Sequence, residues 1–448
     1  MNTQHFDTIV IGSGTSAYFA ITTLAKAGNK VAVIDERPYG GTCALRGCQP
    51  KKYLVANAEA VAMADHLVGK GIAETPRTDW PSLQKHTNEF LDGVSDGEVE
   101  EFQALGITTF MSRAQLTGPN EVTVDGQQIT ADTIILATGS TPRRADIPGA
   151  EHAHDSEHFL RLLELPERIV FIGGGYISFE FAHVAARAGA KEVTILHRSD
   201  RVLKNFDPDM VDIVVEASEA AGISIITNDE PTRYENGPEG LIVHGKDGRK
   251  IEADLIIEAT GRVANLSVLA GDHAGVEHSP RGVVVDEFMR SVSNSSVYAI
   301  GDVIAGSRML APVADEEGNV AAHNILNGPT KPIDRSVVPS AAFTIPSLAT
   351  VGLSEAEAKA QGLDVKVNSG STTGWASSKR IGEAHAGYKV LINNADNTIL
   401  GAHIARHNAA EVINIFALAI KFGIKADDLS EFLWAYPTFT SDLKYMVR

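Results

Sequence analysis

The residues most able to do chemistry are the two cysteines, Cys43 and Cys48, which are the only ones in the chain. They lie in the stretch Gly-Gly-Thr-Cys-Ala-Leu-Arg-Gly-Cys-Gln-Pro-Lys-Lys, which ends at Lys52. If a helix starts here, the four intervening residues bring the sulfurs about one turn apart, within reach of a disulfide. Helix N-terminal N–H groups would lower the pKa of both thiols. We expect a redox-active pair; a pair of buried structural thiols or half of a metal site are the alternatives.

A glycine-rich loop precedes the cysteines and opens a predicted helix. An apolar strand starting at Thr8 runs into Gly12-Ser-Gly14-Thr-Ser-Ala17. Gly12 permits a tight turn, Gly14 lets the backbone approach a pyrophosphate, and Ala17 allows close helix packing. Asp35 ends the next strand, where a carboxylate can accept hydrogen bonds from a ribose. The pattern predicts a dinucleotide site; a purely structural glycine turn is the alternative.

A second loop of the same design begins at Gly173 and continues through Gly175 to Ser178. It also predicts a dinucleotide site. The following strand, predicted over 192–196, leads into His197-Arg198 instead of an acidic residue, and Arg201 and Lys204 come soon after. Arg198 and Lys204 could pair with a 2′-phosphate, which favours NADPH over NADH. The alternative is a solvated basic loop.

The elements around these loops alternate between apolar strands, glycine turns and amphipathic helices, which is typical of parallel sheets covered by helices. Two buried strands run into similar turns, at Thr138-Gly139 and at Thr260-Gly261. After Val337 the pattern changes to an α+β region. It has strands such as 349–352 and 388–393 and helices over 410–422 and 425–434. The sequence therefore predicts an α/β protein with two doubly wound dinucleotide-binding domains and a separate C-terminal α+β domain.

Composition excludes several classes of partner. With 39 Lys+Arg against 57 Asp+Glu the formal net charge is −18, so nucleic acid and anionic membranes would repel the chain. No secretion signal or membrane-spanning run is visible, which predicts a cytoplasmic protein. No metal site is expected, because histidines such as His403 and His407 lack metal-ligand spacing and read as surface or interface residues.

The sequence resembles the class I pyridine nucleotide-disulfide oxidoreductases, the family of glutathione reductase, dihydrolipoamide dehydrogenase and mercuric reductase, over almost its whole length. The motifs that carry the resemblance are the cysteine stretch, both glycine loops, the two Ala-Thr-Gly turns and Tyr298-Ala-Ile-Gly301-Asp302. The resemblance implies FAD-binding segments at 1–145 and 265–335, an NAD(P)H-binding domain at 146–264 and a dimerisation domain at 336–448.

Residue roles follow from the same resemblance. Cys48 faces the flavin and forms a charge-transfer complex, while Cys43 attacks the substrate. Lys51 lies beside flavin N5 with Glu180 as its ion-pair partner, and Tyr176 gates the nicotinamide site. The remaining cofactor-binding candidates are Gly41, Thr42, Lys52, Thr138, Gly139, Gly261, Gly301 and Asp302, with Leu310, Ala311 and Pro312 beneath the pyrimidine end of the flavin.

The resemblance fails near the C-terminus. Relatives that reduce small disulfides carry a His-x-x-x-x-Glu acid/base pair that reaches into the partner subunit. Here Tyr436 replaces the histidine and Ser441 the glutamate. Positioned acid/base groups contribute about 10²- to 10⁴-fold to rate, so efficient glutathione or lipoamide reduction is not expected. Asp442 could compensate, and Tyr436 could equally be a packing residue.

These observations leave several functions open. The leading one is electron transfer from NADPH through FAD to Cys43 and Cys48, and on to a small or protein-borne disulfide that needs no His-Glu pair. A metal-ion or quinone reductase is the second, although the mercuric reductases' extra C-terminal cysteine pair is missing. A dihydrolipoamide dehydrogenase-like enzyme of altered activity and a non-catalytic flavin-binding protein are further alternatives. We expect a homodimer in which each C-terminal tail completes the partner's active site.

Overall fold

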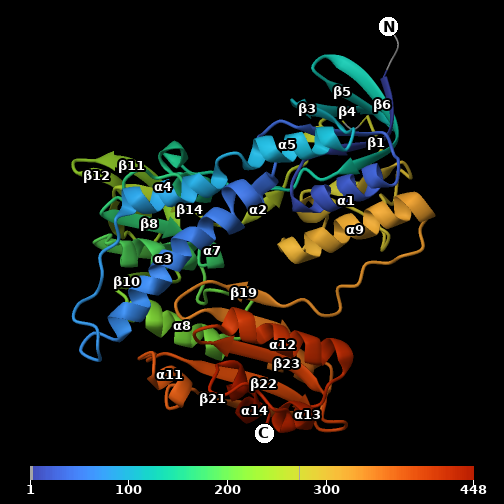
Figure 1. Ribbon diagram of the computed structural model, residues 1–448. Coiled ribbons are helices and arrows are strands. Elements are labelled where there is room, and N and C mark those ends of the chain that lie inside the picture. Colours follow the sequence, from blue (N-terminus) through green and yellow to red (C-terminus); the bar gives the residue numbers. More distant parts are fainter. Residues whose placement is uncertain (1–3, 272) are drawn as a thin grey trace. The chain divides into compact units, whose positions relative to one another are not determined.

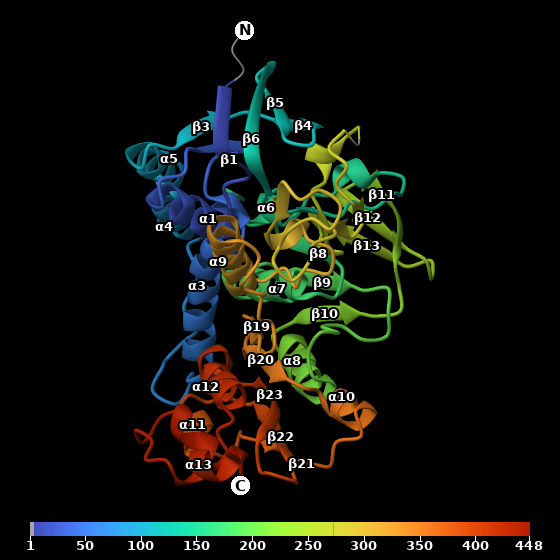
Figure 2. The ribbon, with the colours of Figure 1, turned by 90° about the vertical axis from the view of Figure 1, so that its right-hand side faces the viewer.

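The computed structural model describes residues 4–271 and 273–448 and divides them into two compact units. Unit 1 contains the chain up to Lys52, Lys85–Arg143 and Arg262–Arg335. Unit 2 contains Tyr53–Gln84, Arg144–Gly261 and Ser336–Arg448. Figure 1 labels their helices and strands, and Figure 2 shows them from a second side. The division into four segments expected from the sequence stays a prediction.

Unit 1 is built on a seven-stranded sheet. Its parallel part has the order β3-β2-β1-β6 with β18 beside β6, and β5 and β4 extend it by antiparallel pairing. The apolar run Thr8-Ile-Val-Ile is wholly buried, as expected for a parallel strand covered on both faces. The strands are β1 Gln4–Ile11, β2 Val31–Asp35, β3 Thr108–Met111, β4 Ala114–Gly118, β5 Glu121–Val124, β6 Gln127–Leu136 and β18 Val297–Ala299.

Two helices of unit 1 pack against each other beside this sheet, α1 Thr15–Lys26 and α9 Ala311–Asn327 (Figure 1). The contact is close, because a Cβ on Gly318 would lie 2.1 Å from the Ser16 carbonyl oxygen. Short α2 Gly41–Arg46 leads into α3 Cys48–His66, and α5 Val94–Ala104 precedes β3. Smaller elements are β7 Ser140–Pro142, β15 Arg262–Ala264, η2 Ser267–Leu269, β16 His278–Ser279, β17 Gly282–Val283 and η3 Gly301–Val303. Helix α3 and helix α4, Trp80–Leu91, each cross the boundary between the units in sequence.

The first part of unit 2 holds a parallel sheet of order β10-β9-β8-β14 and an antiparallel sheet β11-β12-β13. Strand β9 covers Glu192–Leu196, as the sequence predicts. The other strands are β8 Arg168–Ile172, β10 Ile223–Ile226, β11 Pro231–Gly237, β12 Gly240–Gly245, β13 Lys250–Ala253 and β14 Leu255–Glu258. The helices are η1 Ala150–His152, α6 Ser156–Phe159, α7 Tyr176–Ala188 and α8 Pro208–Ala220.

The second part of unit 2 is a five-stranded antiparallel sheet of order β19-β20-β23-β22-β21, here called the C-terminal sheet. Its strands are β19 Ser340–Ala342, β20 Leu348–Gly352, β21 Val365–Ser371, β22 Gly387–Asn393 and β23 Ile399–Ala405. Its helices are α10 Glu355–Ala360, α11 Ala376–Lys379, α12 Ala409–Phe422, α13 Ala426–Glu431, η4 Thr440–Asp442 and α14 Leu443–Met446.

The helix predicted over 425–434 is too long. Helix α13 ends at Glu431, because Phe432 leaves the helical region with φ −62° and ψ 142°. Among the described residues, no helix has the length and apolar character needed to cross a membrane.

Candidate active site

The first glycine loop joins β1 to α1 in unit 1. Gly12 has φ +108°, and a Cβ there would lie 2.2 Å from the Ala137 carbonyl oxygen. Gly14 is the N-cap of α1 and makes no side-chain cap hydrogen bond, so backbone N–H groups at this helix start are available to a phosphate. A Cβ on Gly41 would lie 2.4 Å from the Gly14 Cα. Ala17 is fully buried, which is consistent with close packing of the helix.

Two carboxylates predicted to contact a nucleotide are held by short hydrogen bonds. Asp35, at the end of β2, accepts the Ser13 N–H at 2.9 Å and the Ser13 hydroxyl at 2.8 Å. Asp302 in η3 accepts the Ser140 hydroxyl at 2.7 Å, and Arg262 donates to the same Ser140 oxygen at 2.8 Å. Both carboxylates are therefore oriented by neighbouring residues of unit 1.

The remaining candidates of unit 1 have well-defined places. Thr138 donates its hydroxyl to the Asn265 carbonyl at 2.6 Å, which fixes the turn after β6. Glycines in the left-handed region, where a side chain would be strained, are Gly41, Gly139 and Gly301, together with Gly261, the last residue of a segment of unit 2. Leu310 caps α9, Ala311 and Pro312 form its first turn, and Thr42, Lys51 and Lys52 are partly buried on α2 and α3.

The cysteines occupy two successive helices, with Cys43 in α2 and Cys48 as the first residue of α3. Gly47 separates the helices, and a Cβ there would lie 2.9 Å from the Thr42 carbonyl oxygen. The two cysteines form no disulfide; Cys48 is exposed, whereas Cys43 is partly buried. The Cys43 side chain is hydrogen-bonded to Cys48. The predicted proximity of the pair is therefore present.

The expected lowering of both thiol pKa values is wrong for Cys43. Its pKa is raised, first by the hydrogen bond to Cys48, then by burial and by the negative charges of Cys48 and Asp315. Lys51 lowers it, but not enough to reverse the direction. The expectation of a lowered pKa considered only the helix N–H groups and not the neighbouring Cys48 sulfur. That sulfur determines the direction of the Cys43 pKa shift, because two thiolates in contact repel each other. The arrangement favours one thiolate at a time.

The second glycine loop has the same geometry in unit 2. Gly173 has φ +113°, and a Cβ there would lie 2.4 Å from the Ala259 carbonyl oxygen. Gly175 caps α7 without a side-chain hydrogen bond. Ser178 is fully buried, and its hydroxyl has no hydrogen-bond partner among the residues described. An orphaned hydroxyl near a free helix start fits a bound dinucleotide. Tyr176, the proposed gate, is 42% exposed at the start of α7.

Residues 197–207, here called the basic loop, join β9 to α8. His197 Nδ1 accepts the Gly174 N–H at 3.0 Å, and His197 Nε2 lies 3.0 Å from the Arg201 carbonyl, to which it donates. Burial lowers the pKa of His197, which agrees with this neutral form. Arg201 is engaged by Asp212 at 2.9 Å. Arg198 and Lys204 are exposed, so the two cations proposed for a 2′-phosphate are accessible.

Glu180, the expected partner of Lys51, is 1% exposed in α7. Its Oε1 accepts the Phe343 N–H at 2.8 Å, which ties α7 to the residue directly after β19 of the C-terminal sheet. The ion pair with Lys51 stays a prediction.

In the C-terminal segment, the two residues that replace the histidine and the glutamate differ in exposure. The Tyr436 side chain is 74% exposed, whereas Ser441 is buried and donates its hydroxyl to the Thr438 carbonyl at 2.7 Å. Asp442 contacts Arg406 at 2.9 Å and accepts the Ser377 hydroxyl at 2.5 Å. Arg406 itself is fully buried. Asp442 is therefore occupied by structural contacts, and nothing in its position supports a role as a substitute acid or base.

His403 is not a surface residue, contrary to the sequence-based interpretation. It is 2% exposed, and its ring nitrogens contact the Thr350 hydroxyl at 2.5 Å and the Leu353 carbonyl at 3.1 Å. His407 is half-buried and lines a cavity of about 450 Å³ in unit 2. Within the described residues no cluster of His, Cys, Asp and Glu could hold a metal ion.

Sequence reasoning missed the contacts made by His197 and Arg406. His197 directly follows a correctly predicted strand, so its place next to the glycine loop could have been found. The side-chain partners of Arg406 are Ser377 and Ser378 in one segment and Asp442 in another, and no local pattern signals them.

Comparison with known proteins agrees with this geometry. The chain matches the family described as pyridine nucleotide-disulphide oxidoreductase over residues 6–318, and residues 338–447 match its dimerisation domain. A mercuric reductase from Staphylococcus aureus is 32% identical over 98% of this chain and 81% of its own length. A glutathione reductase from Burkholderia cepacia is 32% identical over 99% of this chain and 98% of its own length.

Solved structures give the same result. The HOCl-induced flavoprotein disulfide reductase RclA from Escherichia coli has a TM-score of 0.89 and 26% identity, covering 98% of this chain and 99% of its own. RclA is also known as a Cu(II) complex. The resemblance, the α/β fold class and the use of FAD and NAD(P)H expected from the sequence are confirmed, and the dimerisation domain indicates a homodimer. This chain belongs to the pyridine nucleotide-disulphide oxidoreductase family, whose members are NAD(P)H-dependent flavoprotein enzymes.

Proposed function

We propose that this enzyme takes electrons from NADPH and delivers them through Cys43 and Cys48 to a disulfide whose thiols leave without help from an acid. The observation that carries the proposal is the pair of reduced, hydrogen-bonded thiols at the junction of α2 and α3. FAD, when bound, supplies the transfer of two electrons from NAD(P)H to such a pair. Gly12, Gly14, Asp35 and Asp302 would hold it, with Lys51 near its reacting end.

The dithiol chemistry balances without another group. The Cys43 thiolate attacks the substrate disulfide, forming a mixed disulfide and releasing one thiolate. Cys48, once it has released its proton to solvent, attacks the Cys43 sulfur as a thiolate, which releases the second substrate thiolate and closes the Cys43–Cys48 disulfide. Because the first step needs Cys43 deprotonated, the Cys43 proton must pass to Cys48 or to solvent. The hydrogen bond between the two side chains provides the shorter route.

The C-terminal segment supports one class of acceptor. Ser441 and Asp442 are occupied by contacts within their own subunit, which leaves Tyr436 as the accessible candidate on the tail. We propose that this tail completes the partner's site but supplies no efficient acid. A disulfide whose leaving thiol has a low pKa is therefore favoured, because its thiolate departs unprotonated.

Metal-ion reduction is the second candidate. RclA forms a Cu(II) complex, and mercuric reductases are among the relatives. In such a reaction Cys43 and Cys48 would be oxidised to the disulfide while two Cu(II) ions each gain one electron. No proton has to be delivered to the acceptor, which also fits the missing histidine.

The first experiment reduces the holoenzyme anaerobically with NADPH and mixes it rapidly with disulfides, Cu(II) or quinones while the flavin–thiolate charge-transfer band is followed. Rapid loss of the band with an activated disulfide, abolished in Cys43→Ser, supports disulfide reduction. Loss only with Cu(II), again abolished in Cys43→Ser, supports metal reduction. Turnover of quinones alone, unaffected by Cys43→Ser, would reject the role of the thiols. Ser307→Ala, a hydroxyl substitution distant in sequence from the pair, is the control.

A further inference from the structure

The basic loop is fixed at two of its residues, His197 and Leu203, by the second glycine loop. Besides the His197 contact with Gly174, the Leu203 N–H donates to the Gly174 carbonyl at 2.8 Å. A Cβ on Gly174 would lie 2.7 Å from the His197 ring, so the two segments are in direct contact. Arg198 lies between these two contacts, and Lys204 directly follows Leu203 on the way to the end of the loop.

The end of the basic loop is held by a strand of the C-terminal sheet. Asp207, the last residue of the loop, is the N-cap of α8 and accepts the N–H groups of Asp209 and Met210. Its other carboxylate oxygen contacts Lys389 Nζ of β22 at 2.9 Å. Asp207 and Lys389 are each only 3% exposed. Buried charges of this kind persist only when paired, so each residue fixes the other.

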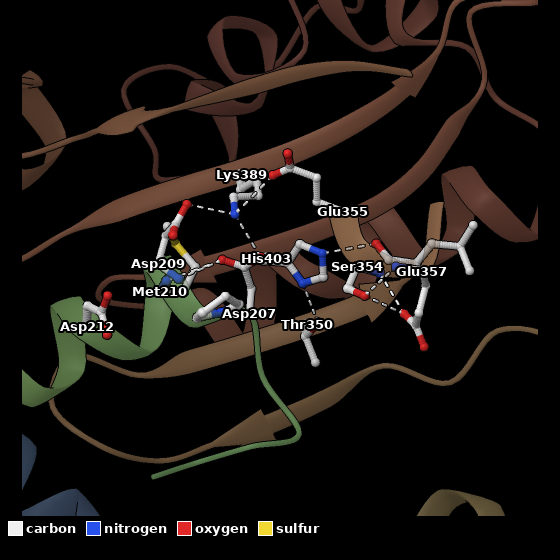
Figure 3. A network of polar contacts seen from close by, with 12 residues as sticks. Asp207, Asp209, Met210, Asp212, Thr350, Ser354, Glu355, Glu357, Lys389 and His403 are labelled. Atoms are coloured by element: carbon white, nitrogen blue, oxygen red, sulfur yellow. Dashed lines mark hydrogen bonds and ion pairs between the residues drawn. The ribbon is translucent and has the colours of Figure 1, made fainter. Parts of the chain in front are cut away.

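Lys389 is surrounded by more negative charge than it neutralises. Figure 3 shows its amine directed towards Asp207, Asp209 and Glu355. Asp209 lies 2.7 Å away and Glu355 3.6 Å away, and both are largely exposed. Burial lowers the pKa of Lys389, but the aspartates raise it further, so the net pKa is above the usual value. His403, opposite Lys389 on β23, uses both ring nitrogens elsewhere and does not compete.

Two exposed cations on a loop bind a phosphate efficiently only if the loop is already in place, because ordering it on binding costs conformational entropy. We infer that Lys389 is a positioning residue for the coenzyme: through Asp207 it holds the basic loop so that Arg198 and Lys204 meet the 2′-phosphate of NADPH. The inference rests on the NADPH preference proposed above. It makes the C-terminal sheet a determinant of coenzyme selectivity.

The test compares Lys389→Met with the wild-type holoenzyme. We expect the KM for NADPH to rise about tenfold, which corresponds to about 1.4 kcal/mol. The KM for NADH should change less than about twofold, with kcat maintained for both. As a binding readout, calorimetry should show about tenfold weaker binding of adenosine 2′,5′-bisphosphate and unchanged binding of 5′-AMP. Lys389→Arg should recover part of the selectivity.

Two further variants keep the test decisive. Lys366→Met removes an exposed lysine from neighbouring β21 and should change neither ligand's affinity. If Lys389→Met does not fold, the double variant Asp207→Asn, Lys389→Met avoids an uncompensated buried charge and should show the same loss of selectivity.

The outcomes separate this inference from the proposed function. A wild-type enzyme that binds both nucleotides equally would remove the NADPH preference itself. A wild-type enzyme that prefers the bisphosphate, with Lys389 variants that retain the preference, would overturn the positioning role alone. Equal weakening of both nucleotides would show a merely structural role and would also overturn it.

Discussion

At the scale of single residues, burial and neighbouring charges determine the pKa of a side chain, and residue type alone does not predict the shift. Cys43 shows this, because the adjacent sulfur reverses the pKa shift expected from a helix start. Glu98 in α5 shows it for a carboxyl group. Burial raises its pKa to about 7, with the negative charges of Asp35 and Glu101 adding to the effect. Its Oε1 is buried without a hydrogen-bond partner among the residues described.

Glu98→Gln should therefore stabilise the protein in a pH-dependent way. The folded pKa of about 7 lies above the unfolded value of 4.5, so the folded state binds more protons between these pH values. Wild-type stability falls as the pH rises from about 4.5 to 7, and the glutamine variant avoids this loss. Allowing for partial solvent screening, we expect Glu98→Gln to increase the free energy of unfolding by about 1–2 kcal/mol at pH 8 and to change it little at pH 4.5.

Thermal melting at both pH values, with excess FAD, measures the difference. Glu100→Gln, an exposed neighbour on α5, is the matched control and should give no pH-dependent gain. The same response from both variants would show that the gain reflects net charge and not the burial of Glu98.

At the scale of elements, the sequence predicts best where one local pattern determines the structure. Strand β9 and both glycine loops fall where predicted, because strand, turn and helix start are encoded within a few consecutive residues. The helix over 425–434 is overpredicted, because Phe432 adopts an extended conformation that the apolar pattern does not reveal. The contacts of Asp442 with Arg406 and of Lys389 with Asp207 join distant segments, so only the tertiary structure reveals them.

The close approach of two glycine turns in unit 1 leads to the next prediction. Gly41→Ala places a methyl carbon 2.4 Å from the Gly14 Cα, so the loop between β1 and α1 must move. We expect FAD affinity to fall by at least about tenfold, or about 1.4 kcal/mol. Flavin retained after dialysis, and titration of the apoprotein with FAD, measure the change.

Gly28→Ala is the matched control for this substitution. Gly28 also has a positive φ, +93°, but a Cβ there meets nothing within 4 Å. Its alanine variant should cost about 1–2 kcal/mol of stability from backbone strain and leave FAD affinity unchanged. If both variants lost flavin alike, backbone strain and not the contact between Gly14 and Gly41 would be responsible.

At the scale of the whole molecule, the match to a dimerisation domain agrees with apolar side chains left exposed around the C-terminal sheet. Leu418 and Phe422 on α12 are 54% and 72% exposed, and Leu433 beyond α13 is 93% exposed. Exposed apolar residues gathered on neighbouring elements are typical of an interface. We expect this surface to be covered by the second subunit.

Leu418→Glu should therefore convert the dimer to a monomer, because a two-fold axis would bury the new charge on both subunits. The monomer should keep its FAD but lose acceptor reduction, since each tail is proposed to complete the partner's site. Sedimentation and turnover measured on the same samples test both parts. Leu163→Glu, at a leucine that is 76% exposed before β8, is the control and should stay dimeric and active. A fully active Leu418→Glu monomer would reject the shared site, whereas an unchanged dimer would place the interface elsewhere.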